Sequence, residues 1–173
     1  NDDQLVRDEA QHLKVVGDPT EAALLVSAAK GGLVHAEAND TMARVDMIPF
    51  TSENMFRATL HEAKQGRMIY KVGALEMLLE QCVDALSDQG KHVPLDRAAV
   101  LQVAEKMAAD GLRVIGMARR RVEAKHAKLM HRNVTEQCTF LGLQGMMDPP
   151  RAAAITAIAD CQRAGITVKM ITG

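Results

Sequence analysis

Aromatic and basic side chains gather in one stretch of the chain, residues 47–72. Three of the four aromatic residues lie there, with several cations close by: Phe50, Phe56, Tyr70, Arg57, Lys64, Arg67 and Lys71. A nucleotide needs such a set, because its base stacks on an aromatic face while its phosphates bind ammonium and guanidinium groups. On composition alone a simpler interpretation is favoured, in which Phe50 and Phe56 are core residues of a hairpin.

A carboxylate that could join such a site, Glu21, lies in a segment with both helix ends encoded. Asp18 is the expected N-cap, Pro19 takes the first helical position, and Gly31 is the expected left-handed terminator. Glu21 stands where a capping box places its carboxylate, so it needs no ligand to be satisfied. From these residues alone, a capping role for Glu21 is favoured over binding.

Two strands joined by a turn are expected to position the aromatic and basic side chains. Residues 55–61 alternate, with Phe56, Ala58 and Leu60 on one face and Met55, Arg57, Thr59 and His61 on the other. A turn at 63–66 leads back into a second arm over 67–72, which predicts an antiparallel hairpin.

The remaining pattern predicts an α+β fold, an antiparallel twisted sheet flanked by helices. Helices are expected at 74–82 and 95–109, the second burying Val100, Val103, Ala104 and Met107. A strand at 112–119 carries Arg113, and a charged surface excursion follows at 119–132. The final residues predict a β-α-β crossover: a strand at 138–145, a helix at 151–164 and a strand at 166–171.

Composition excludes several classes of protein. With 173 residues and a net charge of −1, the chain has the size of one domain with a core and lacks the basic field of a nucleic-acid binder. No apolar run is long enough to span a bilayer, so no direct membrane contact is expected. Cys82, Cys138 and Cys161 lack metal-ligand spacing, and His126 and His131 lie among cations, so no metal site is expected.

Familiar catalytic motifs are absent from the sequence. It has no Gly-x-x-x-x-Gly-Lys-Ser/Thr loop, no Gly-x-Gly-x-x-Gly fingerprint and no Gly-x-Ser-x-Gly elbow. The residues therefore predict a binding constellation without a catalytic nucleophile.

Six short blocks carry a resemblance to a known family. They are residues 17–24 (GDPTEAAL), 48–54 (IPFTSEN), 72–76 (VGALE), 110–114 (DGLRV), 147–151 (MDPPR) and 170–173 (MITG). In order and rough spacing they resemble the large cytoplasmic loop of P-type cation-transporting ATPases, in the calcium-pump and sodium-pump branch, with a bacterial member expected.

The resemblance implies a nucleotide-binding (N) domain over residues 1–143 and the start of the second segment of the phosphorylation (P) domain over 144–173. It implies ATP as ligand, with Mg2+ carried by the nucleotide, and phosphoryl transfer to an aspartate outside this chain, which would be inactive alone. The partners implied are the remaining phosphorylation, actuator and transmembrane domains of an ion pump in a plasma or inner membrane, with this part in the cytoplasm.

The resemblance also implies roles for individual residues. Phe50 is similar to the ring that stacks on adenine, Glu21 to the carboxylate near the adenine amino group, and Arg113 to an arginine that faces the phosphates. Gly73 matches a glycine of the nucleotide site. The phosphorylation-domain motifs match Asp148, Arg151, Thr172 and Gly173.

Two departures from the family pattern concern cations of the site. Met55 stands where the family has Lys or Arg, but Arg57, two residues further on, lies on the same strand face and could supply the charge. Lys71 precedes Val72, whereas the family has its lysine directly before the glycine. Without a bulge, Val72 would face the nucleotide and Lys71 would face away, although Lys71 stays a candidate site residue.

Two other functions remain open from the residues alone. One is a fragment of a soluble α/β phosphohydrolase, which would need its own nucleophilic aspartate. The other is a non-enzymatic interaction domain whose basic hairpin contacts a protein partner.

Overall fold

A seven-stranded sheet forms the centre of the computed structural model, which describes residues 4–7, 13–16, 18–33, 35–147 and 150–171. In spatial order its strands are β3 (Arg44–Ile48), β4 (Phe56–Glu62), β5 (Arg67–Gly73), β8 (Arg113–Val122), β9 (Cys138–Met146), β6 (Cys82–Leu86) and β7 (His92–Val93). Within the described residues, every neighbouring pair is antiparallel except β6 and β9. The predicted α+β class with an antiparallel sheet is confirmed.

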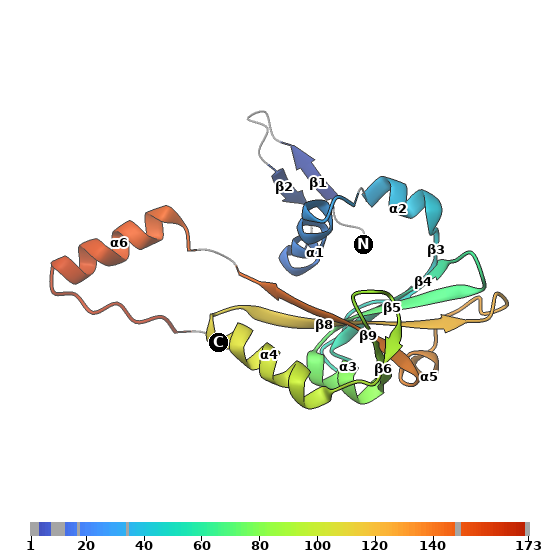
Figure 1. Cartoon of the computed structure of the whole chain (residues 1–173). Helices are drawn as coiled ribbons and strands as arrows, with labels where there is room; N and C mark the ends of the chain where they lie inside the picture. Colours follow the sequence, from blue (N-terminus) through green and yellow to red (C-terminus); the bar gives the residue numbers. More distant parts are fainter. Residues whose placement is uncertain (1–3, 8–12, 17, 34, 148–149, 172–173) are drawn as a thin grey trace.

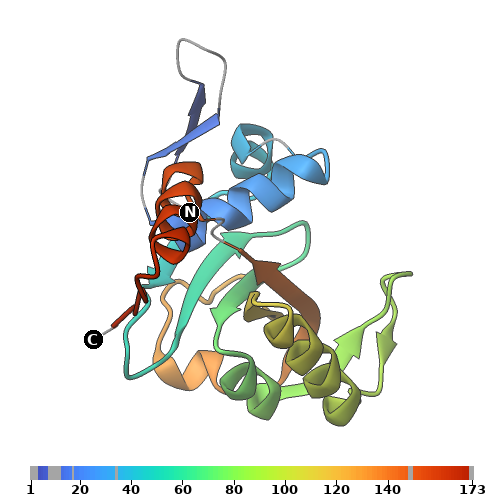
Figure 2. The ribbon, with the colours of Figure 1, turned by 90° about the vertical axis from the view of Figure 1, so that its left-hand side faces the viewer.

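Helices cover both faces of this sheet (Figures 1 and 2). One side carries α1 (Pro19–Lys30), α2 (His35–Thr41) and a small hairpin of β1 (Gln4–Arg7) and β2 (Leu13–Val16). The other side carries α3 (Leu75–Gln81), α4 (Arg97–Ala109) and α5 (His131–Val134). We call the sheet face toward α1 the outer face and the face toward α3 the core face.

The hairpin of β4 and β5 forms as the alternation predicts. Its register runs without irregularity from Phe56 opposite Gly73 to Glu62 opposite Arg67. Ala58 and Leu60 are fully buried on the core face, whereas Arg57 and Thr59, one residue out of phase, are only partly buried on the outer face. Because side chains alternate along a strand, this register decides which of them can reach the α1 side.

The core lies between the core face and α3. Leu75, Leu78 and Leu79 of α3 are all buried there, as their helical spacing predicts. In α4, Ala104 is buried, but Val103 is 50% exposed, which corrects its predicted place in the core. Val103 directly precedes Ala104, so it lies about 100° away around the helix and points off the packed stripe.

Some elements differ from the predicted ones. The strand β8 continues to Val122 instead of ending at residue 119, and the short elements β6, β7 and α5 were not predicted. At the end of α1, Gly31 keeps a negative φ of −78°, and Gly32, with φ of +79°, takes the left-handed conformation. The expected stop is therefore present one residue later.

The expected β-α-β crossover is wrong in its last strand. The helix α6 (Ala152–Arg163) forms after its N-cap Arg151, but residues 166–171 adopt no regular secondary structure. The strand β9 cannot pair with them, because β8 and β6 already occupy both of its edges. The expected cap at Asp148 and Pro149, and the motif residues Thr172 and Gly173, lie outside the described residues.

The helix α6 projects from the rest of the fold in Figure 1, and none of its residues is buried. None of the described helices is both long and apolar enough to cross a membrane.

Candidate functional site

A cavity of about 950 Å3 opens beside the first turn of α1, at the end of β5 that leads into α3. Its walls come from α1, the segment before β4, the strands β4, β5 and β8, and the helices α3 and α4. Five of the six residues expected at a nucleotide site line it: Glu21, Phe50, Arg57, Gly73 and Arg113. The fold thus gathers residues that lie as far apart in the sequence as Glu21 and Arg113.

The sixth expected residue, Lys71, lies on the other side of the sheet. It is 1% exposed on the core face, opposite Ala58 in the regular register, while Val72 lines the cavity. The expectation that a strand without a bulge turns Lys71 away is therefore confirmed, and its assignment to the site is corrected.

Lys71 is instead a buried cation with partners of its own. Its Nζ donates to Gln81 Oε1 and to the Val134 carbonyl at 2.5 Å, and it lies 4.0 Å from the centroid of the Phe56 ring. Burial lowers the pKa of the Lys71 ammonium. Lys71 thus joins β5 to the ends of α3 and α5.

The two phenylalanines of the stretch have different environments. Phe56 is 2% exposed in the core, whereas Phe50 is 56% exposed and lines the cavity. The hairpin-core interpretation holds for Phe56 and is wrong for Phe50. An exposed aromatic ring at the wall of a cavity can stack on a planar ligand without being removed from the core.

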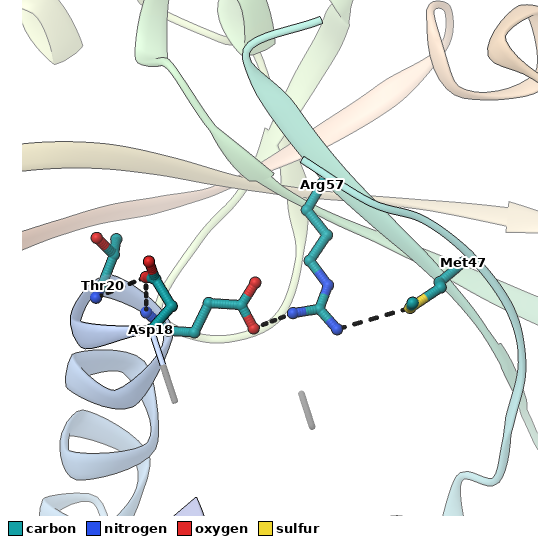
Figure 3. A network of polar contacts seen from close by, with 5 residues as sticks. Asp18, Thr20, Met47 and Arg57 are labelled. Carbon is teal, nitrogen blue, oxygen red and sulfur yellow. Dashed lines mark hydrogen bonds and ion pairs between the residues drawn. The ribbon is translucent and has the colours of Figure 1, made fainter. Parts of the chain in front are cut away.

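The position of Glu21 follows from the N-terminal cap of α1. Asp18 Oδ1 accepts hydrogen bonds from the backbone N–H groups of Thr20 at 2.8 Å and Glu21 at 3.1 Å (Figure 3). This cap fixes the first helical turn, so the Glu21 side chain leaves α1 at the cavity wall. There its Oε2 forms an ion pair with Arg57 Nη1.

Arg57 reaches α1 from the outer face of β4. Its guanidinium bridges Glu21 on one side and Met47 Sδ of β3, at 3.8 Å, on the other (Figure 3). The side chains of Arg57 and Glu21 are only 16% and 25% exposed, so this ion pair is partly buried. Met55, at the family's cationic position, precedes β4 with a left-handed φ of +53° and also lines the cavity.

Arg113 approaches α1 from the first position of β8. Its Nη1 lies 3.5 Å from Thr20 Oγ1, and its side chain lines the cavity near the helix N-terminus. A guanidinium beside the first turn of a helix is a suitable place for an anion, because both the charge and the helix dipole favour it.

Gly73 lines the cavity where a side chain has no room. A Cβ there would lie 2.3 Å from the Met55 carbonyl oxygen and 2.6 Å from Phe56 Cα. Since these are backbone atoms, only glycine lets β5 approach the start of β4 this closely. Gly73 thus contributes to the shape of the cavity wall and offers no side chain to a ligand.

The charged residues at the cavity wall are mostly acidic. Four carboxylates line it, against two guanidinium groups: Asp18, Glu21, Glu76, Glu105, Arg57 and Arg113. The other hairpin cations do not reach it, since Lys64 lies in the exposed turn and Arg67 pairs with Glu62 at 2.8 Å. In the part of the chain that the structure describes, no three His, Cys, Asp or Glu side chains cluster to hold a metal ion.

Sequence reasoning missed several lining residues. Val72 was expected to face the nucleotide and does line the cavity, whereas Thr59 and Tyr70 were not assigned to the site, although both follow from strand alternation once Arg57 is placed on the outer face. Leu101, Glu105 and Ala108 of α4 carry no local signal, because only the packing of α4 beside α3 brings them to the cavity.

Comparison with known proteins agrees with the family resemblance of the six sequence blocks. The family model described as "P-type ATPase, cytoplasmic domain N" matches residues 1–153. The whole chain is 47% identical to "Cation-transporting ATPase pma1" of Synechocystis sp. and covers 19% of that protein. It is 32% identical to "Calcium-transporting ATPase 1" of Bacillus cereus and 33% to "Sodium/potassium-transporting ATPase subunit alpha-2" of Bos taurus, over 91% of this chain in each case, and it covers 18% and 17% of them. The chain therefore spans about a fifth of the length of these relatives.

Proposed function

Because the chain belongs to the P-type ATPases, as their cytoplasmic domain N, we propose that the cavity beside α1 binds ATP. The observation that carries this proposal is the Phe50 ring, 56% exposed at the wall of a cavity that is also lined by Glu21 and Arg113. A base can stack on that ring while a carboxylate accepts from its amino group and a guanidinium attracts its phosphates.

The phosphates are expected to lie toward Arg113. This guanidinium is next to the N-terminus of α1, and its hydrogen bond to Thr20 Oγ1 is long, at 3.5 Å. Mg2+ would arrive on the phosphate oxygens, which suits a cavity wall where no acidic cluster in the described residues could hold a metal ion alone. The chain's own part in the chemistry is then to bind and orient the nucleotide.

In the whole protein we propose that this domain presents MgATP to an aspartate outside the chain, and that phosphoryl transfer drives the transport of a cation across a membrane. The names of the bacterial and animal relatives, which are cation-transporting ATPases, support this role. The family membership disfavours a separate soluble phosphohydrolase, and the cavity disfavours a pure interaction domain.

We further propose that residues 144–173 begin the phosphorylation domain, with Asp148, Arg151, Thr172 and Gly173 as its motif residues. The helix α6 supports a separate unit that follows β9, whose pairing in the sheet extends to Met146, because α6 buries none of its residues against the sheet and exposes Ile155 by 57% and Ile158 by 44%. An apolar stripe of this kind is expected to pack on another part of the same protein.

A titration of the isotope-labelled chain with ATP, followed by NMR, tests the proposal. Binding in the cavity should shift the ring signals of Phe50 and the amide signals of Glu21, Gly73 and Arg113. The turn at 63–66 serves as an internal control, since it lies at the opposite end of the hairpin. An unperturbed cavity at millimolar ATP, with the protein folded, would exclude the proposed function.

A further inference from the structure

Arg57 has a specific task that rests on the proposed function of the cavity. We propose that Arg57 is a positioning residue for Glu21: it holds the Glu21 carboxylate where it selects a 6-amino purine over a 6-oxo purine, and it is not a phosphate ligand. This differs from the expectation that Arg57 replaces the cation missing at Met55.

The contacts of the guanidinium support a positioning role. It is bound by Glu21 Oε2 of α1 on one side and approaches Met47 Sδ of β3 on the other. A planar guanidinium with donors in fixed directions orients a carboxylate better than a flexible ammonium does. The cap at Asp18 fixes the backbone of Glu21, and Arg57 then fixes its side chain.

An ionised carboxylate so oriented discriminates between purines by hydrogen-bond polarity. It can only accept, so it favours the amino group at position 6 of adenine. Hypoxanthine presents a carbonyl oxygen there, and two acceptors facing each other in a partly buried site are unfavourable. A site built to pair with a donor thus rejects the ligand that lacks it.

The charges of the cavity make the phosphate role unfavourable for Arg57. If Arg57 turned to a phosphate, its ion pair with the partly buried Glu21 carboxylate would break next to a polyanion. Asp18, Glu76 and Glu105 already make the cavity wall acidic. Arg113, next to Thr20, can meet the phosphates without breaking an ion pair that the structure shows.

The test compares wild type with Arg57→Met and Arg57→Lys. Methionine is a long side chain without the charge, and lysine keeps the charge but lacks the planar guanidinium with its donors in fixed directions. Dissociation constants for adenosine, inosine and ATP are measured by calorimetry. We expect wild type to prefer adenosine over inosine, and Arg57→Met to reduce that preference at least fivefold while weakening adenosine and ATP by the same factor. Arg57→Lys should keep part of the preference.

A second variant guards against a merely structural effect. Glu21→Gln should lose the preference too, and adding Arg57→Met to Glu21→Gln should not change it further, because the two residues act as one unit. Should Arg57→Met fail to fold, Glu21→Gln still tests the selection by the carboxylate, and Arg57→Lys still tests its positioning.

The outcomes distinguish a failure of the role proposed for Arg57 from a failure of the proposed function. If Arg57→Met weakens ATP but not adenosine, Arg57 is a phosphate ligand and the inference is overturned. It is also overturned if the preference for adenosine survives in the folded Arg57→Met protein. If wild type binds neither adenosine nor ATP, the proposed function itself fails.

Discussion

Lys71 and Val72 are neighbours in β5 whose side chains end on opposite sides of the sheet. Lys71 is 1% exposed in the core, where it binds Gln81 and the Val134 carbonyl, and Val72 lines the cavity beside α1. The register of β4 and β5 has no bulge, so this alternation is fixed by the pairing itself. A further cation supplied by this part of β5 would therefore reach the cavity from position 72 and not from position 71.

The change Val72→Lys should tighten ATP binding by about 1 kcal/mol, roughly fivefold, if its ammonium forms one partly solvated contact with phosphate. Affinities measured at low and high salt check this, because the gain should shrink as salt screens the charge. Val72→Gln is the control, of similar polarity without charge. A gain of equal size in Val72→Gln would contradict the electrostatic explanation.

Phe50 and Phe56 form a matched pair for substitution. Phe50→Ala should leave the free energy of unfolding nearly unchanged, because the ring is 56% exposed, and should weaken ATP binding ten- to a hundredfold by removing about 1 to 3 kcal/mol of stacking. Phe56→Ala should lower the free energy of unfolding by about 3 to 5 kcal/mol, since that ring is in the core. Urea unfolding and ATP titration of both variants check this assignment. It would be wrong if Phe50→Ala lowered the free energy of unfolding and Phe56→Ala weakened ATP binding in a stable protein.

Gly73→Ala should destabilise the protein by about 1 to 3 kcal/mol and disturb the cavity. The new Cβ would lie 2.3 Å from the Met55 carbonyl oxygen, so the segment before β4 must move. Its cross-strand partner Gly116 is the control, because a Cβ there would lie 3.3 and 3.4 Å from side-chain ends of Leu75 and Leu78, and the backbone atom it meets, Leu75 Cα, is at the ordinary contact distance of 3.5 Å. Thermal melting of both variants measures the loss of stability. An equal loss in Gly73→Ala and Gly116→Ala would contradict the backbone clash.

The isolated chain should bind AMP, ADP and ATP within about tenfold of one another, a spread of about 1.4 kcal/mol. The reason is that four carboxylates at the cavity wall oppose the added negative charge, while two guanidinium groups attract it. Calorimetry of the three nucleotides at one salt concentration measures the spread. A strong preference for ATP, or steady release of phosphate by the pure chain, is the contrary result.

The buried thiols predict a loss of stability in alkali. Burial, with a further contribution from Cys138, raises the pKa of the Cys82 thiol to about 12. In the unfolded chain this thiol ionises near pH 8.5, so its stabilising contribution is complete below that pH and is lost as the pH rises toward 12. The difference in unfolding free energy between wild type and Cys82→Ala should therefore decrease from pH 8 to pH 10, as urea titrations would show. A difference independent of pH would mean that the thiol ionises equally in both states.

The same burial predicts which thiol is reactive. Cys161 is partly exposed on α6, whereas Cys82 and Cys138 are buried with raised pKa values. A thiol-specific reagent at neutral pH should label Cys161 quickly and the other two only after unfolding, as mass spectrometry can show.

Local patterns in the sequence were sufficient for the elements whose structure depends on near neighbours. Alternation at 55–61 predicted the β4–β5 hairpin and its faces, and the spacing of Leu75, Leu78 and Leu79 predicted the buried stripe of α3. The cap at Asp18 was readable because it is made within three residues of the helix start. In each case the side chains that decide the structure are close in sequence.

Tertiary packing decided the rest, because burial depends on what covers a side chain and not on its own type. Phe50 and Phe56 look alike in the sequence, yet only Phe56 has a helix layer over it, and Phe50 faces the cavity. The sequence likewise left Lys71 as a candidate site residue that would face away from the nucleotide, and only the structure shows that α3 and α5 supply its acceptors. Glu21 meets Arg57 only because α1 packs on the outer face, 36 residues away in the chain. Long-range contacts of this kind leave no local periodicity, so only the folded structure shows them.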